Sequence, residues 1–175
     1  MLQIAILAAS LLTTRIASAD TSPVTHSAEL PISVEKAWNA FTKPEEMTQW
    51  MVAKAQVDLR VGGKMLTSYS KDSNLHDETT IENTYLSYDP QRMISMQATG
   101  QPKGFPFKEA IKKMWTVIYF EPAGPDKTRL TVRSLGFADD DESQKMRAFF
   151  DRGNKATMDA LISYAAKKSG TANAK

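Results

Sequence analysis

Histidine is the side chain best suited to acid–base chemistry near neutral pH, and the 175-residue chain has two, His26 and His76. His76 precedes Asp77 and Glu78 in a polar stretch. A His–Asp pair that faced a cavity could act as a general base, so His76 is a candidate catalytic residue, although a solvated surface cluster is the simpler interpretation. The two histidines lie far apart in the sequence and the chain has no cysteine, so we expect no metal site.

Other patterns that carry chemistry are missing from the sequence. No serine lies in a nucleophile-elbow pattern, and Gly62-Gly63 lacks GxGxxG spacing and predicts a hairpin turn. The acidic run 139–142 lacks the spaced oxygen ligands of a calcium loop and predicts the start of a helix. The sequence therefore predicts no cofactor and does not decide whether the protein is an enzyme.

Large apolar and aromatic side chains are plentiful: seven Phe, five Tyr, three Trp and nine Met. Such residues usually form core, but ligand cavities are also mostly apolar with a few placed polar groups. Gly153 lies in a helical pattern, where glycine costs roughly 1 kcal/mol relative to alanine. Its presence indicates either that space is needed on that face or that the helix packs closely against an aromatic residue. We expect these residues to line a ligand cavity: Trp50, Met65, Tyr69, Tyr85, Met96, Trp115, Tyr119, Phe149 and Gly153.

The charge balance excludes two classes of partner. The chain has 22 Lys and Arg against 20 Asp and Glu, a net charge of +2, with 42% hydrophobic residues. This composition is ordinary for one globular domain. It gives no basic surface for nucleic acid and no polybasic membrane tether, so we expect neither partner.

The N-terminus has the pattern of a secretory signal. The apolar run 4–12 is far shorter than the ~20 residues of a membrane-spanning helix. Ala17-Ser18-Ala19 follows it as a small-x-small cleavage site. We expect residues 1–19 to be removed by cleavage after Ala19, leaving no stable membrane anchor. The mature protein would then be periplasmic or secreted, with one domain over 20–168 and a disordered tail over 169–175.

Periodicity predicts one strand, two short helices, about six strands and one long helix. Ser33 is a candidate N-cap for the first helix, and Thr42 with Glu45 forms a candidate capping box for the second. Alternating patterns predict strands over 55–61, 65–69, 79–88, 93–98, 110–121 and 128–137, the last with a bulge or twist between Val132 and Leu135. Residues 99–107 predict a long loop with apolar contents.

The last segment has the clearest pattern. Apolar residues recur at three- and four-residue spacing from Met146 to Tyr164, and Gly170 is expected to end the helix. A helix of about 25 residues needs a broad surface to lie against. Because the strands are grouped before it, we expect an α+β fold in which a curved antiparallel sheet of six to seven strands wraps around this helix.

This order of elements resembles the helix-grip fold of the START-related (SRPBCC) superfamily. It is most similar to the group named for the C-terminal domain of the activator of the heat-shock-protein-90 ATPase. The matching stretches are 33–45 with Trp50, 58–64, 85–92, 128–133 and the terminal helix. The resemblance implies an elongated cavity between helix and sheet, which in this superfamily often binds an apolar small molecule. Its members also include co-chaperone domains, cyclases and dehydratases, so fold alone does not assign a function.

Three functions follow from these observations. The first is non-catalytic binding of a small, mostly apolar molecule. The second is a lyase- or cyclase-like enzyme that uses cavity tyrosines, an acid or His76 as acid–base groups. The third is a protein-interaction module, with an apolar patch on the outer face of strand 114–120 and a possible homodimer. A co-chaperone role conflicts with export, because that chaperone and its ATP are absent from the periplasm.

Overall fold

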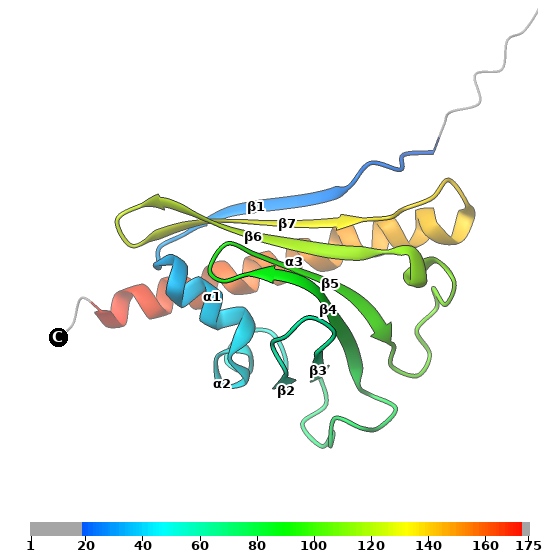
Figure 1. Ribbon diagram of the computed structural model, residues 1–175, viewed down its shortest axis with the longest axis horizontal. Helices are drawn as coiled ribbons and strands as arrows, with labels where there is room; N and C mark the ends of the chain where they lie inside the picture. The colour runs from blue at the N-terminus through cyan, green and yellow to red at the C-terminus, as the bar shows by residue number, and fades with distance from the viewer. Residues whose placement is uncertain (1–18, 173–175) are drawn as a thin grey trace, which may run out of the picture.

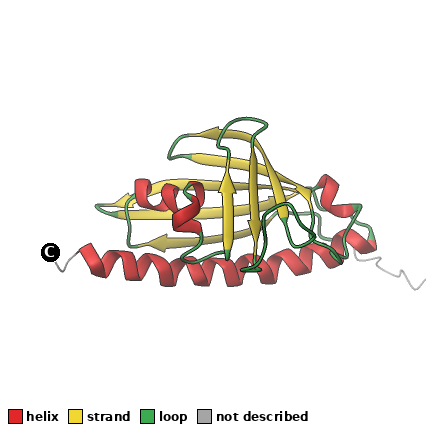
Figure 2. Ribbon diagram, turned by 90° about the horizontal axis from the view of Figure 1, so that it is seen from below, coloured by secondary structure: helices red, strands yellow, loops and turns green. Residues whose placement is uncertain are grey.

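The computed structural model describes residues 19–172. Seven antiparallel strands form one curled sheet in the order β1-β7-β6-β5-β4-β3-β2, and a long helix, α3, lies against it (Figure 1). Seen from below, α3 runs along the whole length of the sheet, while two short helices, α1 and α2, lie toward one end (Figure 2). This arrangement confirms the predicted α+β helix-grip fold.

The elements have the following bounds. The strands are β1 Val24–Leu30, β2 Lys54–Val57, β3 Lys64–Ser68, β4 Ile81–Asp89, β5 Met93–Gly100, β6 Trp115–Gly124 and β7 Lys127–Leu135. The helices are α1 Val34–Thr42, α2 Pro44–Met47, the 3-10 helix η1 Ala110–Lys113 and α3 Asp141–Ala172.

The first helix begins as predicted, but the second is capped differently. The Ser33 hydroxyl accepts a hydrogen bond from the Lys36 backbone N–H at 3.4 Å, which makes Ser33 the N-cap of α1. Thr42 does not cap α2, so the predicted capping box is wrong. Thr42 is the last residue of α1, where its hydroxyl donates to the Trp38 carbonyl at 2.9 Å.

Three strand predictions also need correction. The strand predicted over 55–61 ends at Val57, because the chain turns over residues 58–63 before β3. Residues 110–113 form η1 rather than the start of a strand, because Ala110 and Ile111 are buried in a small core with Met146. The predicted bulge near Val132 is absent, since β7 keeps its register there with both neighbouring strands. The apolar pattern changes at that point because Ser134 faces the interior.

The terminal helix is longer than predicted. It continues through Gly170 to Ala172, so residues 169–172 belong to the helix and not to a tail. Residues 1–18, which hold almost all of the predicted signal, and residues 173–175 lie outside the described part of the chain. Within residues 19–172, no helix is both long enough and apolar enough to span a membrane.

The hydrophobic core is divided into two clusters along α3. One lies where α1 and α2 meet the sheet and includes Met158 and Leu161 of α3. The other lies around η1 and includes Met146. Between them, residues 147–157 of α3 contribute no fully buried side chain. Phe150 is half-buried and packs against the second core, whereas residues 151–157 belong to neither core.

Candidate ligand-binding cavity

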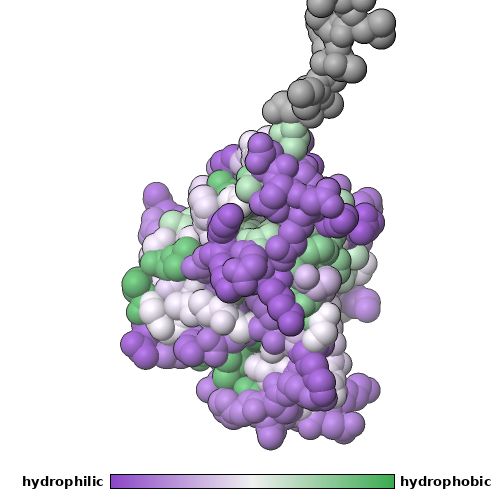
Figure 3. All heavy atoms as spheres, turned by 90° about the vertical axis from the view of Figure 1, so that its right-hand side faces the viewer, coloured by the Kyte–Doolittle hydropathy of each residue, from purple (hydrophilic) through white to green (hydrophobic). Residues whose placement is uncertain are grey.

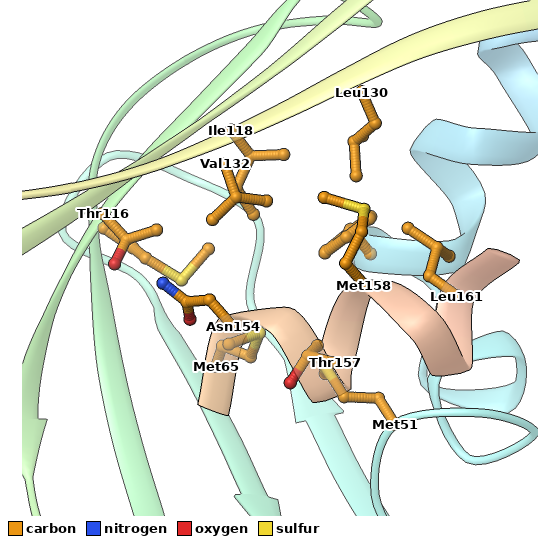
Figure 4. Close-up of a pocket in the computed structure, with 12 residues that line it drawn as sticks. Met51, Met65, Thr116, Ile118, Leu130, Val132, Asn154, Thr157, Met158 and Leu161 are labelled. Atoms are coloured by element: carbon orange, nitrogen blue, oxygen red, sulfur yellow. The ribbon is translucent and has the colours of Figure 1, made fainter. Parts of the chain in front are cut away.

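An inner cavity of about 130 Å³ lies between the concave face of the sheet and α3 (Figure 4). Ile118, Leu130 and Val132 come from the sheet, and Met158 and Leu161 come from α3. The remaining lining residues are Phe41, Met51, Met65, Met96, Thr116, Asn154 and Thr157. Four of the lining residues are methionines, whose flexible thioethers adapt to irregular shapes. The cavity is thus a mostly apolar and adaptable space.

A larger outer chamber of about 610 Å³ lies beside it, which is within the usual size range of small-molecule sites. Its wall consists of one face of α3, the turn after α2, the ends of β3, β4 and β5, and the loop 101–109. The lining residues are Trp50, Met51, Tyr69, Ile81, Asn83, Ala98, Gln101, Pro102, Phe105, Phe149, Phe150, Gly153, Asn154, Ala156, Thr157 and Ala160. The Phe105 and Phe149 rings lie 6.1 Å apart, so the loop packs directly on the helix.

The surface at this end of the molecule is mostly polar. Figure 3 faces the end that carries the loop 101–109 and the start of α3, and hydrophilic residues cover most of it. Hydrophobic residues appear in separate small patches. The apolar lining of the chamber is therefore not part of one broad apolar surface on this face.

The two spaces share a neck, which we define as Met51, Asn154 and Thr157 because these residues line both. Figure 4 shows Asn154 and Thr157 extending from α3. The Asn154 Nδ2 group donates to the Ser134 hydroxyl at 2.9 Å, and the Thr157 hydroxyl donates to the Gly153 carbonyl at 2.9 Å. No described residue donates to Asn154 Oδ1 or to the Thr157 oxygen. Both therefore remain available as acceptors.

The lining is almost free of ionisable groups. Among the described residues that line the inner cavity or the outer chamber, the only ionisable side chain is that of Tyr69. Tyr69 is 70% exposed, so it lies at the edge of the chamber. Burying an unpaired charge is strongly unfavourable, so this lining suits an uncharged molecule.

Six of the nine predicted cavity residues line one of these spaces. Met65 and Met96 line the inner cavity. Trp50, Tyr69, Phe149 and Gly153 line the outer chamber.

Trp115, Tyr119 and Tyr85 line neither space. Residues along β6 alternate between its two faces, and Thr116 and Ile118 are the ones that face the cavity. Trp115 and Tyr119 therefore lie on the outer face, where they are 37% and 36% exposed.

Tyr85 belongs to the packed core instead, with 1% of its surface exposed. Its hydroxyl has no hydrogen-bond partner among the described residues. Burial, with a smaller contribution from the Asp58 carboxylate, raises the pKa of Tyr85 to about 12.

His76 lies in an exposed loop and lines neither space, so the structure does not support it as a general base for a bound ligand. The Asp77 carboxylate organises this loop by accepting hydrogen bonds from Ser73, Asn74 and Thr79. These bonds, led by the one from the Thr79 hydroxyl, hold the pKa of Asp77 well below its usual range.

The other histidine lies elsewhere on the molecule. His26, on β1, contacts the Asp151 carboxylate of α3 at 3.0 Å. Within residues 19–172, no three His, Cys, Asp or Glu side chains come together as a metal site.

Gly153 resolves one of the alternatives raised by the sequence. A Cβ atom at this position would meet no atom within 4 Å, so the helix does not pack closely against an aromatic residue there. The close-packing interpretation is wrong. Gly153 borders open space at the outer chamber instead.

The sequence analysis missed the polar neck. Asn154 and Thr157 lie on the same helical stripe as Phe150 and Leu161, at spacings of three and four residues. Two polar residues on an otherwise apolar stripe were the available signal. The partner of Asn154, Ser134, is likewise a polar residue at an inward position of its strand.

Residues 31–166 match the family described as Activator of Hsp90 ATPase homolog 1-like protein. The chain belongs to this family. No curated protein sequence matches it.

Solved structures share the fold of this Activator of Hsp90 ATPase homolog 1-like chain at low sequence identity. A protein of Mesorhizobium loti is 16% identical, with 83% of this chain and 98% of that chain covered and a TM-score of 0.64. The Aha1 dimer of Colwellia psychrerythraea is 13% identical, with 81% and 93% covered and a TM-score of 0.62.

Norcoclaurine synthase of Thalictrum flavum, solved with dopamine and hydroxybenzaldehyde, is 14% identical, with 95% and 97% covered and a TM-score of 0.56. At these identities the likeness shows the helix-grip fold alone. The activities of these proteins do not transfer to this chain.

Proposed function

We propose that the protein binds a small, mostly apolar molecule in the inner cavity and outer chamber, without covalent chemistry. The observation that carries this proposal is the pair of adjoining, mostly apolar spaces beneath the middle of α3: the inner cavity is bounded by side chains of the first core, and the outer chamber lies between the first core and the second. We further propose that it does so in the periplasm or outside the cell, which rests on the signal pattern over residues 1–19.

The size and lining of the inner cavity support binding of an apolar group. An engineered apolar cavity of about 150 Å³ stays dry and binds benzene or xenon. The inner cavity, at about 130 Å³, has similar dimensions and a similarly apolar lining. Transfer of apolar surface from water contributes about 25 cal/mol per Å², so filling this space with a ring or short chain is favourable.

The lining favours binding over acid–base catalysis. An enzyme of the cyclase or lyase kind would need a titratable group beside its substrate. The described lining offers only the Tyr69 hydroxyl, at the exposed edge of the chamber. His76 is exposed and lines neither space, so it does not support the enzymatic alternative.

Two matched substitutions test the proposed function. Val132→Phe adds a ring inside the inner cavity, whereas Val117→Phe adds the same ring on the outer face of the same sheet. Each variant and the wild type would be purified from the protein's own host. Solvent extracts of the three proteins would then be compared by liquid chromatography and mass spectrometry.

We expect the wild type and Val117→Phe to release the same apolar compound and Val132→Phe to release at least tenfold less. Urea unfolding of each variant would check that the protein is folded. Equal amounts of that compound from all three folded proteins, or no compound from the wild type, would contradict the proposal.

A further inference from the structure

We infer that the outer face of the sheet docks a protein segment that carries a carboxylate, and that Arg133 is the partner of this carboxylate. We define the outer docking surface as Trp115, Tyr119 and Arg133. None of these residues lines the inner cavity or the outer chamber, so the inference goes beyond the proposed function and does not depend on it. It comes from a half-buried arginine without a partner and from the two aromatic residues beside it.

Arg133 differs from the other half-buried charged residues in having no partner. Every other half-buried Lys, Arg, Asp or Glu in residues 19–170 forms a hydrogen bond or an ion pair; these residues are Glu46, Asp77, Glu82, Glu142, Arg147 and Lys168. No described residue forms either contact with the Arg133 side chain. A charge that has lost part of its hydration is stabilised by an ionic or hydrogen-bonding partner. The isolated protein offers Arg133 no such partner, and a second molecule could supply it.

The register of the sheet places Arg133 between two aromatic residues. On β7, Arg133 lies between the two residues that pair with Tyr119 and Trp115 of β6. Val132 lines the inner cavity, so the alternation of the strand turns Arg133 to the outer face. Diagonal neighbours in an antiparallel sheet lie within reach of long side chains. The Trp115 ring also leans toward β7, because a Cβ atom built at Gly136 would lie 3.0 Å from its Cζ3 atom.

The shape of this face favours a macromolecular partner. The inner cavity and α3 lie on the concave side of the curled sheet (Figure 4), so the outer face is convex. Trp115 and Tyr119 remain 37% and 36% exposed there. Small-molecule sites are concave, so a convex face does not suit them. Trp, Tyr and Arg are the residue types most enriched at the energetic centres of protein interfaces.

Charge decides which macromolecule fits. Near Arg133, the outer face carries Arg129, which pairs with Glu29 at 2.9 Å, and the exposed Glu121, which lies opposite Arg129. Two arginines and two glutamates leave no net positive charge. Nucleic acids and anionic lipid surfaces are held by several basic residues together. A single unpaired guanidinium instead matches one carboxylate, which it can bind through two parallel hydrogen bonds. A peptide with an Asp or Glu beside an apolar side chain would satisfy Arg133 and cover the two rings.

Selection from a displayed library of random linear peptides tests this surface. The wild-type protein would be the target, and we expect the selected peptides to share an Asp or Glu next to an aromatic or aliphatic residue. One selected peptide would then be synthesised together with a version in which the acid is replaced by its amide. Calorimetric titration at pH 7 would give the dissociation constant of each peptide.

Arg133→Gln removes the charge while keeping a polar side chain, and we expect it to bind the acidic peptide at least about tenfold more weakly than the wild type. The amide peptide should lose a similar factor on the wild type. It should lose less than about twofold more on Arg133→Gln, because both changes remove the same ion pair. Arg152→Gln, at an exposed position of α3, is the matched control and should bind the acidic peptide as the wild type does.

Several results would overturn the inference. Urea unfolding would first confirm that each variant is folded. Selection of no peptide, or of peptides without an acidic residue, would contradict the surface assigned here. An equal loss from the amide peptide on wild type and on Arg133→Gln would show that Arg133 does not pair with the carboxylate. A wild-type dimer in sedimentation that Arg133→Gln separates would assign the face to a second copy of this chain instead.

Discussion

Gly153 lies in the interior of α3 but gains no packing there, because a Cβ atom at this position would meet nothing within 4 Å. Glycine in a helix interior is less favourable than alanine by about 1 kcal/mol. We therefore expect Gly153→Ala to raise the free energy of unfolding by about this amount, measured by urea denaturation.

Gly63→Ala provides the opposite case. A Cβ atom at Gly63 would lie 2.1 Å from the Asp58 carbonyl oxygen, so this substitution should destabilise the protein. A loss of stability in Gly153→Ala would mean that the helix is packed at this point, contrary to the structure.

The buried hydroxyl of Tyr85 leads to a second prediction. A buried polar group without a partner destabilises the folded state, so Tyr85→Phe should be as stable as the wild type at pH 7, or more stable by up to about 1 kcal/mol. Urea unfolding at pH 7 would measure this difference. A clear decrease in stability would show that the hydroxyl has a partner in solution.

The pKa of Tyr85 adds a dependence on alkaline pH. Burial raises this pKa from 10.0 to about 12. Since the unfolded chain releases the proton first, the resulting stability is fully present below pH 10 and is lost as the pH rises toward 12. Tyr85→Phe should therefore lose less stability over that range than the wild type.

For single residues, the sequence predicted which apolar side chains line the cavity better than it predicted which polar side chains pair with each other. The apolar cavity residues Met65 and Met96 follow from strand patterning, since both lie on inward-facing positions. The pairing of Asn154 with Ser134 joins positions far apart in the chain, and each residue alone resembles an interruption of an apolar pattern. Only the tertiary structure brings them together.

Between elements, a cluster of Glu46, Tyr164 and Lys168 connects α2 to the last turns of α3. The Glu46 carboxylate accepts from the Tyr164 hydroxyl and pairs with the Lys168 ammonium at 2.8 Å. The bond from Lys168, followed by that from Tyr164, holds the pKa of Glu46 below its usual range. The stability that this carboxylate contributes is thus present above its unfolded pKa, near 4.5, and is lost as the pH falls through its lower folded value.

We expect Glu46→Gln to lower the free energy of unfolding by about 1 kcal/mol at pH 7. At pH 3 the difference in unfolding free energy between the variant and the wild type should be smaller. Glu45→Gln, at the exposed neighbouring position of α2, is the matched control and should change stability little. Urea titrations at both pH values would measure this. An equal effect of the two substitutions at pH 7 would argue against the cluster.

The order of the elements was predictable because strand alternation and helical spacing are local patterns. The residues at which each helix or strand begins and ends were less predictable. Ala110 and Ile111 continue an apolar run but are buried in η1, and Thr42 closes one helix instead of opening the next. These boundaries depend on the tertiary contacts that the side chains make, and a short sequence pattern contains no information about those contacts.

For the whole molecule, the antiparallel sheet and its long helix follow from the grouping of strands before a single amphipathic helix. The hollow beneath the helix does not follow from such patterns. They show which side of an element is apolar but not whether the opposing side chains meet. Here the inner cavity is left within the first core cluster, and the outer chamber lies between that cluster and the second.

A crystal structure determined under xenon pressure would test this central claim most directly, because xenon enters empty apolar cavities. We expect xenon between α3 and the sheet, in contact with Met65, Met96 and Met158, and no xenon there in Val132→Phe crystals. Wild-type crystals without xenon at this position, with the methionine side chains filling the space, would contradict the account.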